Sequence, residues 1–189
     1  MKEIPFLEST IPPETGDDSP TDVGLIDNIL VVPGSQPLRW CALEIQAVYF
    51  SGGAMSKDFA AIRSHDGPGI PFPAANRHPD YRSSAPKRLM PQLQIKVPSL
   101  RRWGKKMAVV IDRDFFRNMG PMLYVKDVSN CDVAWFIVRF DESKQDAVLV
   151  EEEVRYTTLE QSVEGLTAGT PVSLTEFETR MRTKMAPGD

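Results

Sequence analysis

The sequence predicts a single α/β domain built on a mixed sheet of about four or five strands. The chain has 189 residues, which is enough for one sizeable hydrophobic core. Short, β-branched apolar runs bounded by glycine and proline are typical of strands. They alternate with segments whose apolar residues recur at helical spacing, as in mixed α/β proteins.

Two strands are predicted near the N-terminus, at residues 25–32 and 40–50. The first is rich in leucine, isoleucine and valine, and the second is apolar with three aromatic residues. The connection, residues 33–39, contains two prolines and a glycine and has the length of a hairpin turn. The two strands are therefore predicted to pair in antiparallel fashion.

The middle of the chain is predicted to be less regular. Residues 54–63 are compatible with a short helix, and the prolines and glycines of residues 66–80 predict an irregular loop. Residues 86–103 have helical spacing, but Pro91 and Pro98 interrupt it. Because proline removes a backbone donor from a helix interior, we expect two short helices or one kinked helix there.

The C-terminal half continues the alternation. The patterns predict a buried strand at 106–112, a short helix at 114–119, strands at 133–140 and 147–156, and a helical tail over 157–185 that breaks at 165–171. No internal repeat is visible.

Charge is distributed in blocks. Residues 1–22 hold six acids, one lysine and four prolines, which predicts an acidic, proline-rich lead-in before a single domain at 23–189. Residues 81–111 contain no acid and eight basic residues, which predicts a surface for a polyanion. The alternative is a solvated helix face balanced by acids elsewhere. The basic residues are Arg82, Lys87, Arg88, Lys96, Arg101, Arg102, Lys105 and Lys106.

Several classes of protein are excluded by composition. The formal net charge of −4 excludes a globally basic nucleic-acid coat. No apolar run approaches the roughly 18 residues of a membrane span, and the first residues lack the apolar core of a secretory signal, so we expect a soluble cytoplasmic protein. Cys41 and Cys131 are too few for a disulfide framework or a four-cysteine metal site.

The candidate site lies on the first two predicted strands. Asp27 stands among apolar neighbours, where a carboxylate is costly. Glu44 and Gln46 are two apart on a strand, so they share one face while Leu43 and Ile45 point to the other. If the strands form a hairpin, Asp27 and Glu44 reach a common spot suited to Mg²⁺, where a water could be activated against a phosphodiester. The alternative is that these polar residues face solvent without a function.

An acid on one strand followed by E-x-K on the next is the signature of the PD-(D/E)XK nucleases, and E-x-Q is a variant among type II restriction endonucleases. Two strings carry a closer resemblance: WCALEIQAVYFSG and YRSSAPKRLMPQLQIKVPSLRRWGKKMAVVIDRDFF. In this order they resemble the NotI-type restriction endonucleases, most clearly over residues 22–140.

The resemblance implies a restriction-endonuclease-like fold with a mixed central sheet flanked by helices. It also implies an Mg²⁺-dependent endonuclease that cuts double-stranded DNA as a homodimer at a palindromic site, with a protecting DNA methyltransferase as partner. Asp27 and Glu44 would bind metal, with Asp22 the only nearby competitor for the first position. Gln46 stands where most of the superfamily has lysine, and would orient the attacking water.

With this resemblance, the eight basic residues are expected to contact DNA, and Gln92 or Gln94 could read adenine. The four-cysteine iron module known in the family is not expected here, because only two cysteines are present. Two alternatives stay open: a non-catalytic DNA-binding relative that keeps the fold, and a structure-specific DNA repair nuclease that needs no palindrome.

Overall fold

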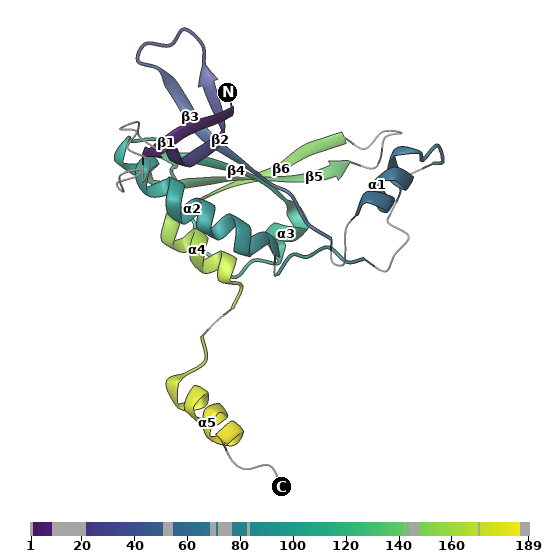
Figure 1. The fold of residues 1–189 in the computed structure, drawn as a ribbon. Coiled ribbons are helices and arrows are strands. Elements are labelled where there is room, and N and C mark those ends of the chain that lie inside the picture. Colours follow the sequence, from purple (N-terminus) through teal and green to yellow (C-terminus); the bar gives the residue numbers. More distant parts are fainter. Residues whose placement is uncertain are drawn as a thin grey trace, which may run out of the picture.

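A computed structural model describes residues 2–8, 22–50, 55–68, 71, 77–82, 84–141, 143, 148–169 and 171–185. Within these residues one sheet of six strands has the spatial order β1-β2-β3-β4-β5-β6 (Figure 1). The strands are β1 (Lys2–Glu8), β2 (Asp22–Val32), β3 (Arg39–Gln46), β4 (Met107–Asp112), β5 (Val133–Asp141) and β6 (Val148–Thr157).

The sheet is mixed, as predicted. β3, β4 and β5 run parallel, and the outer pairs β1–β2, β2–β3 and β5–β6 are antiparallel. The parallel connection from β3 to β4 passes through the long helix α2 (Ser84–Arg102). Figure 1 shows α2, α3 (Arg113–Arg117) and α4 (Leu159–Thr167) on the same side of the sheet.

The predicted β2–β3 hairpin is confirmed, with Gly34 in the left-handed conformation within its turn. β3 is shorter than expected, since it ends at Gln46 instead of residue 50. Its partner β4 supplies the reason. Gln46 pairs with Ile111, and one residue later Asp112 ends β4 by accepting hydrogen bonds from the first amides of α3.

Of the two alternatives predicted for residues 86–103, the structure has a single helix, α2, which is continuous through Pro91 and Pro98. An interior proline costs about 3 kcal/mol or more. Four buried leucine and valine side chains offset that cost, each contributing about 1.5–3 kcal/mol. They follow one another at helical spacing and are Leu89, Leu93, Val97 and Leu100.

The hydrophobic core lies between this apolar stripe and the central strands. Alternate residues of β4 and β5 face it, because successive strand side chains point to opposite sides. The fully buried members on these strands are Met107, Val109, Ile111, Val133, Trp135 and Ile137. α4 packs against α2 and closes the same face.

Part of the acidic lead-in, residues 2–8, belongs to the sheet. They form β1, which pairs with β2 and makes the sheet one strand wider than expected. Ile4 lies opposite the buried Ile26, so the strand adds to the core despite its acids. Residues 9–21 of the lead-in lie outside the described residues.

The remaining elements agree with the predictions to within a few residues. They are α1 (Ser56–Arg63), α3, α4 and α5 (Leu174–Met185). The 3₁₀ turn η1 (Val128–Asn130) was not predicted. The described residues of the 66–80 segment lie outside helices and strands, apart from an isolated bridge between Phe50 and Pro79. Among the helices the structure describes, none has the length and apolar character to cross a membrane.

Candidate active site

Asp27 and Glu44 come together at the inner end of the β2–β3 hairpin. The pairing of these strands places Asn28 opposite Leu43, so Asp27 and Glu44 follow at the next position on each strand. Asp22, the competing acid, lies opposite Glu8 at the start of β2, five residues earlier. The hairpin register therefore favours Asp27 as the partner of Glu44.

A third residue joins them. Lys96 of α2 donates from its Nζ to Asp27 Oδ2 at 2.6 Å and to Glu44 Oε2 at 3.0 Å. Two carboxylates from adjacent strands thus converge on one ammonium supplied by the helix that covers them. We refer to Asp27, Glu44 and Lys96 as the acidic-pair cluster.

The two carboxylates titrate differently. The hydrogen bond from Lys96 holds the pKa of Asp27 below its ordinary value. Burial raises the pKa of Glu44, and the charge of Asp27 acts in the same direction, while Lys96 opposes both. The difference follows from exposure: the side chain of Asp27 is 49% exposed and that of Glu44 is 14% exposed.

Glu44 and Gln46 share the helix-facing side of β3, as predicted. They pair with Val109 and Ile111, both fully buried, whereas Ile45 between them is 60% exposed on the other side. Gln46 is 8% exposed, and its Nε2 donates to the carbonyl of Ala47 at 2.7 Å. One of its two amide hydrogens is therefore engaged by the neighbouring backbone.

A groove of about 440 Å³ opens beside Glu44 and Gln46. Its walls include Lys87 and Arg88 from the first turns of α2, and Gln92 one turn further on. Arg88 stacks over the ring of Tyr49 at 4.3 Å, which fixes its guanidinium at the rim. A groove lined by the carboxylate of Glu44 and by the cations Lys87 and Arg88 suits a phosphate group that approaches with a metal ion.

The eight basic residues do not form one surface. Three of them are exposed at the N-terminal end of α2: Lys87 and Arg88 line the groove, and Arg82 lies two residues before the helix, beside a separate pocket. Lys96 is 3% exposed and lies in the acidic-pair cluster, so it is not part of an open basic surface. The other four lie at the C-terminal end of α2 or just beyond it: Arg101, Arg102, Lys105 and Lys106.

Most of this distal group is engaged within the protein. Arg101 binds Asp132 and Glu160, and Lys106 donates to the carbonyls of Ser129 and Cys131. Lys105 lies over a tryptophan ring and donates to a backbone carbonyl. The basic run therefore separates into a group beside the groove and a group that mainly holds the fold together.

The sequence analysis missed the place of Lys96 in the site, although a signal was present. Lys96 lies three residues after Leu93 and four before Leu100, so it stands on the buried stripe of α2. A lysine on such a stripe needs an anionic partner inside the protein. Asp27 shows the opposite error: its apolar sequence neighbours suggested burial, yet half of its side chain is exposed.

The residues of the cluster fit a divalent cation. Nowhere in the described ranges do three or more histidine, cysteine or acidic side chains gather around one possible metal position. Mg²⁺ does not require this, because it is commonly held by one or two carboxylates together with waters and substrate phosphates. Asp27 and Glu44 already direct oxygens at one cation, the ammonium of Lys96.

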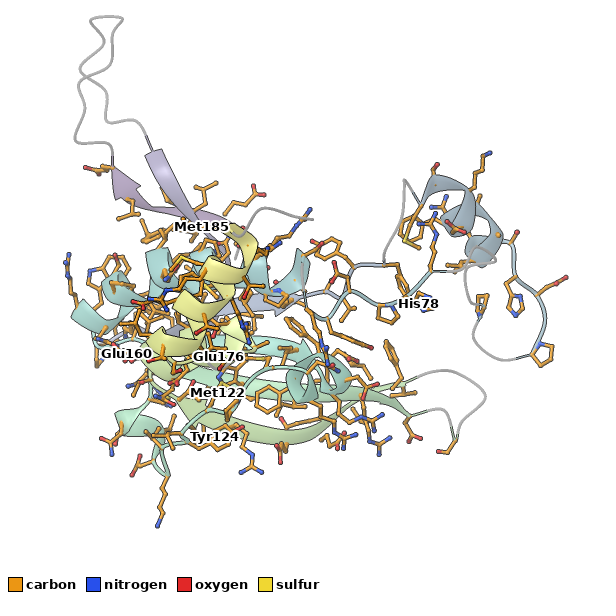
Figure 2. All side chains as sticks on the ribbon, turned by 90° about the horizontal axis from the view of Figure 1, so that it is seen from below. His78, Met122, Tyr124, Glu160, Glu176 and Met185 are labelled. Carbon is orange, nitrogen blue, oxygen red and sulfur yellow. The ribbon has the colours of Figure 1, made fainter. Side chains whose placement is uncertain are left out.

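The two histidines take no part in this cluster. His65 and His78 are both exposed. Figure 2 shows His78 on the side of the molecule toward α1, apart from Met122, Tyr124 and Glu160 beneath the sheet. The acidic-pair cluster and the groove are therefore the candidate site.

A mixed sheet covered by helices, with two carboxylates on adjacent strands and cations from α2 beside them, is compatible with the class of restriction-endonuclease-like proteins. The sequence matches the family described as Restriction endonuclease NotI over residues 2–152, and the chain belongs to this family. It is accordingly a type II restriction endonuclease, an enzyme that hydrolyses DNA at specific sites. The match extends beyond residues 22–140, where the resemblance was expected. No curated protein matched the sequence.

Proposed function

We propose that this endonuclease hydrolyses phosphodiester bonds of double-stranded DNA with Mg²⁺ held by Asp27 and Glu44. The observation that carries the proposal is the convergence of both carboxylates on one cationic position, at 2.6 and 3.0 Å from Lys96 Nζ. In this proposal the site belongs to the PD-(D/E)XK superfamily in its E-x-Q form, with Glu44 and Gln46 as the motif on β3.

Mg²⁺, when bound, supplies a Lewis acid for the phosphoryl oxygen and lowers the pKa of water. The protein's own residues supply position and charge. Asp27 and Glu44 provide hard oxygen ligands from two adjacent strands, which fixes their separation. Gln46 lies beside Glu44 on the same face of β3 and orients the attacking water through the part of its amide that Ala47 does not use.

DNA is proposed to enter over the groove. Arg82, Lys87 and Arg88 are the exposed cations at that end of α2, and they would contact phosphates and fix the register of the duplex. Gln92, which lines the groove, is better placed than Gln94 to reach an adenine edge.

We further propose that the enzyme acts as a homodimer. One chain carries one acidic-pair cluster, whereas cutting both strands of a palindrome requires two sites related by a two-fold axis. The cytoplasm as its location and a DNA methyltransferase that protects the host sequence complete the proposal. Residues 23–189 would form the nuclease domain, to which β1 adds one strand.

The experiment is cleavage of bacterial genomic DNA with Mg²⁺, since a genome offers on the order of 10⁶ or more positions at which a rare site can occur. We expect discrete fragments from the wild-type chain. Glu44→Gln and Asp27→Asn should lower the rate by at least about 10²-fold, because each removes a charged metal ligand.

The matched control is Glu151→Gln, which makes the same chemical change at an exposed position of β6. It should cleave at the wild-type rate. DNA binding measured with Ca²⁺ in place of Mg²⁺ shows whether the site variants still bind. Unchanged cleavage by Glu44→Gln would remove Glu44 from the site, and absence of cleavage by the wild-type chain would contradict the proposed function.

A further inference from the structure

Lys96 is a lysine whose charged side chain is buried. It is 3% exposed, it stands on the apolar stripe of α2, and both of its hydrogen-bond partners that the structure gives are the proposed metal ligands. Placing an ammonium inside a protein is unfavourable unless anions compensate it. Here two carboxylates do so, and they are the two that the proposed reaction uses.

The neighbouring position on β3 lacks a charge. Gln46, two residues after Glu44, is neutral, and its Nε2 is engaged by the carbonyl of Ala47. Phosphodiester hydrolysis adds negative charge at the reacting phosphate, and a preorganised cation in a site of limited water access stabilises that charge. The only side-chain cation that the described residues place within hydrogen-bond distance of Glu44 is Lys96.

The cluster is also accessible to a substrate. The whole side chain of Lys96 is buried, but Asp27 is half exposed and Glu44 lines the groove that Lys87 and Arg88 flank. A phosphate seated in that groove would therefore come near the carboxylates that hold Nζ.

We propose that Lys96 is a catalytic residue that supplies, from α2, the positive charge that Gln46 does not supply from β3. This inference rests on the proposed function. In the hydrolytic step a water oxygen forms a new bond to phosphorus, and one ester P–O bond breaks. The water gives up its proton to solvent, and the leaving oxygen takes one from solvent. Lys96 keeps its proton throughout and stabilises the charge that develops on the phosphoryl oxygens.

Relocating the charge tests the proposal. Lys96→Met keeps the length of the side chain and removes its charge, and we expect the single-turnover rate of cleavage to fall by about 10²-fold or more. Adding Gln46→Lys to this variant returns a cation to the same site, and we expect it to recover at least about tenfold of the loss. Lys126→Met, at an exposed position, is the matched control and should retain the wild-type rate.

Metal binding provides a readout other than activity. Calorimetric titration with Mn²⁺ should give tighter binding to Lys96→Met than to the wild-type chain, because a cation beside both ligands has been removed. The double variant should return toward the wild-type affinity. Equal Mn²⁺ affinities for the wild-type chain and Lys96→Met would place Lys96 outside the metal site and overturn the proposal.

A further variant covers the case in which Lys96→Met does not fold. Lys96→Arg keeps the charge, but its planar guanidinium cannot place a compact charge at the same point, so we expect cleavage to fall by about tenfold or more. Wild-type cleavage by a folded Lys96→Met or by Lys96→Arg would overturn the catalytic role and leave the proposed function standing. Loss of cleavage in the wild-type chain itself would overturn both.

Discussion

Burial raises the pKa of both a carboxyl and a thiol in this protein, but the partners of the two groups differ. Glu44 is largely buried and has its pKa raised, but a lysine compensates its charge. Cys131 is buried as well, and desolvation raises the pKa of its thiol, while the charge of Lys106 opposes the shift. Its Sγ donates to the carbonyl of Val128 at 3.1 Å. Glu44 thus has a cationic side chain as its partner, whereas the thiol of Cys131 has a backbone carbonyl.

The thiols give a prediction at this scale. A raised pKa leaves less thiolate at a given pH, so both Cys41 and Cys131 should react slowly with iodoacetamide at pH 8. We expect Cys131 in the native chain to react at least about tenfold more slowly than in urea, and more slowly than the less buried Cys41. Mass spectrometry of timed samples measures both rates. Equal native and denatured rates for Cys131 would contradict its burial.

At the residue scale, the local sequence pattern brings Asp27 and Glu44 together but does not predict that Lys96 joins them. Asp27, Glu44 and Gln46 can be predicted because strand alternation fixes which side chains share a face. Lys96 lies 52 residues after Glu44 in sequence, and only the packing of α2 on the sheet brings the two together. A contact of that kind depends on tertiary structure, which local patterns do not specify.

At the scale of elements, a buried hydrogen-bond chain joins β5, β6 and α4. Trp135 Nε1 donates to Thr157 Oγ1 at 2.8 Å, and Thr157 Oγ1 lies 2.7 Å from Ser162 Oγ. Ser162 donates its only hydroxyl proton to the carbonyl of Thr158, so Thr157 is the donor to Ser162. Every polar atom of this chain is satisfied inside the core.

This chain predicts a measurable cost. Thr157→Val preserves the shape of the side chain but leaves the indole N–H of Trp135 without its partner, so the free energy of unfolding should fall by about 1–3 kcal/mol. Ser162→Ala removes the end of the chain and should cost less, about 0.5–1.5 kcal/mol. Urea unfolding measures both. A Thr157→Val midpoint equal to that of the wild type would contradict the role of the hydroxyl.

Most elements could be predicted because their signals are local. β4 and β5 are short apolar runs, and Asp112 stands at the N-cap of α3, where its side chain accepts two amide hydrogens. The structure departs from the local patterns where pairing or packing with another element decides whether a segment is ordered or continuous. β1 is ordered by pairing with β2, and α2 continues through two prolines because its apolar stripe packs on the sheet.

At the scale of the molecule, charge is segregated although the net charge is −4. α2 has 19 residues and so spans about 28 Å, which separates the basic residues beside the groove from those beyond Arg101. DNA binding should therefore depend on the first group.

Salt dependence tests this division. Lys87→Met and Arg88→Met should each reduce the slope of log affinity against log salt concentration by about 1, because each removes one phosphate contact. Arg102→Met makes a comparable change at the other end of α2 and should leave the slope unaltered. Fluorescence anisotropy with Ca²⁺ and a DNA duplex provides the measurement. A reduced slope for Arg102→Met alone would place the interface at the wrong end of the helix.

If the acidic-pair cluster cuts DNA at one specific sequence, the fragments that the enzyme produces from genomic DNA with Mg²⁺ share their end sequences. Sequencing of these ends is the decisive measurement, with Glu44→Gln as the control. We predict that the wild-type fragments end within one shared palindrome and that this set of ends disappears in the variant. Ends scattered over unrelated sequences, or a shared palindrome that persists in Glu44→Gln, would contradict the account.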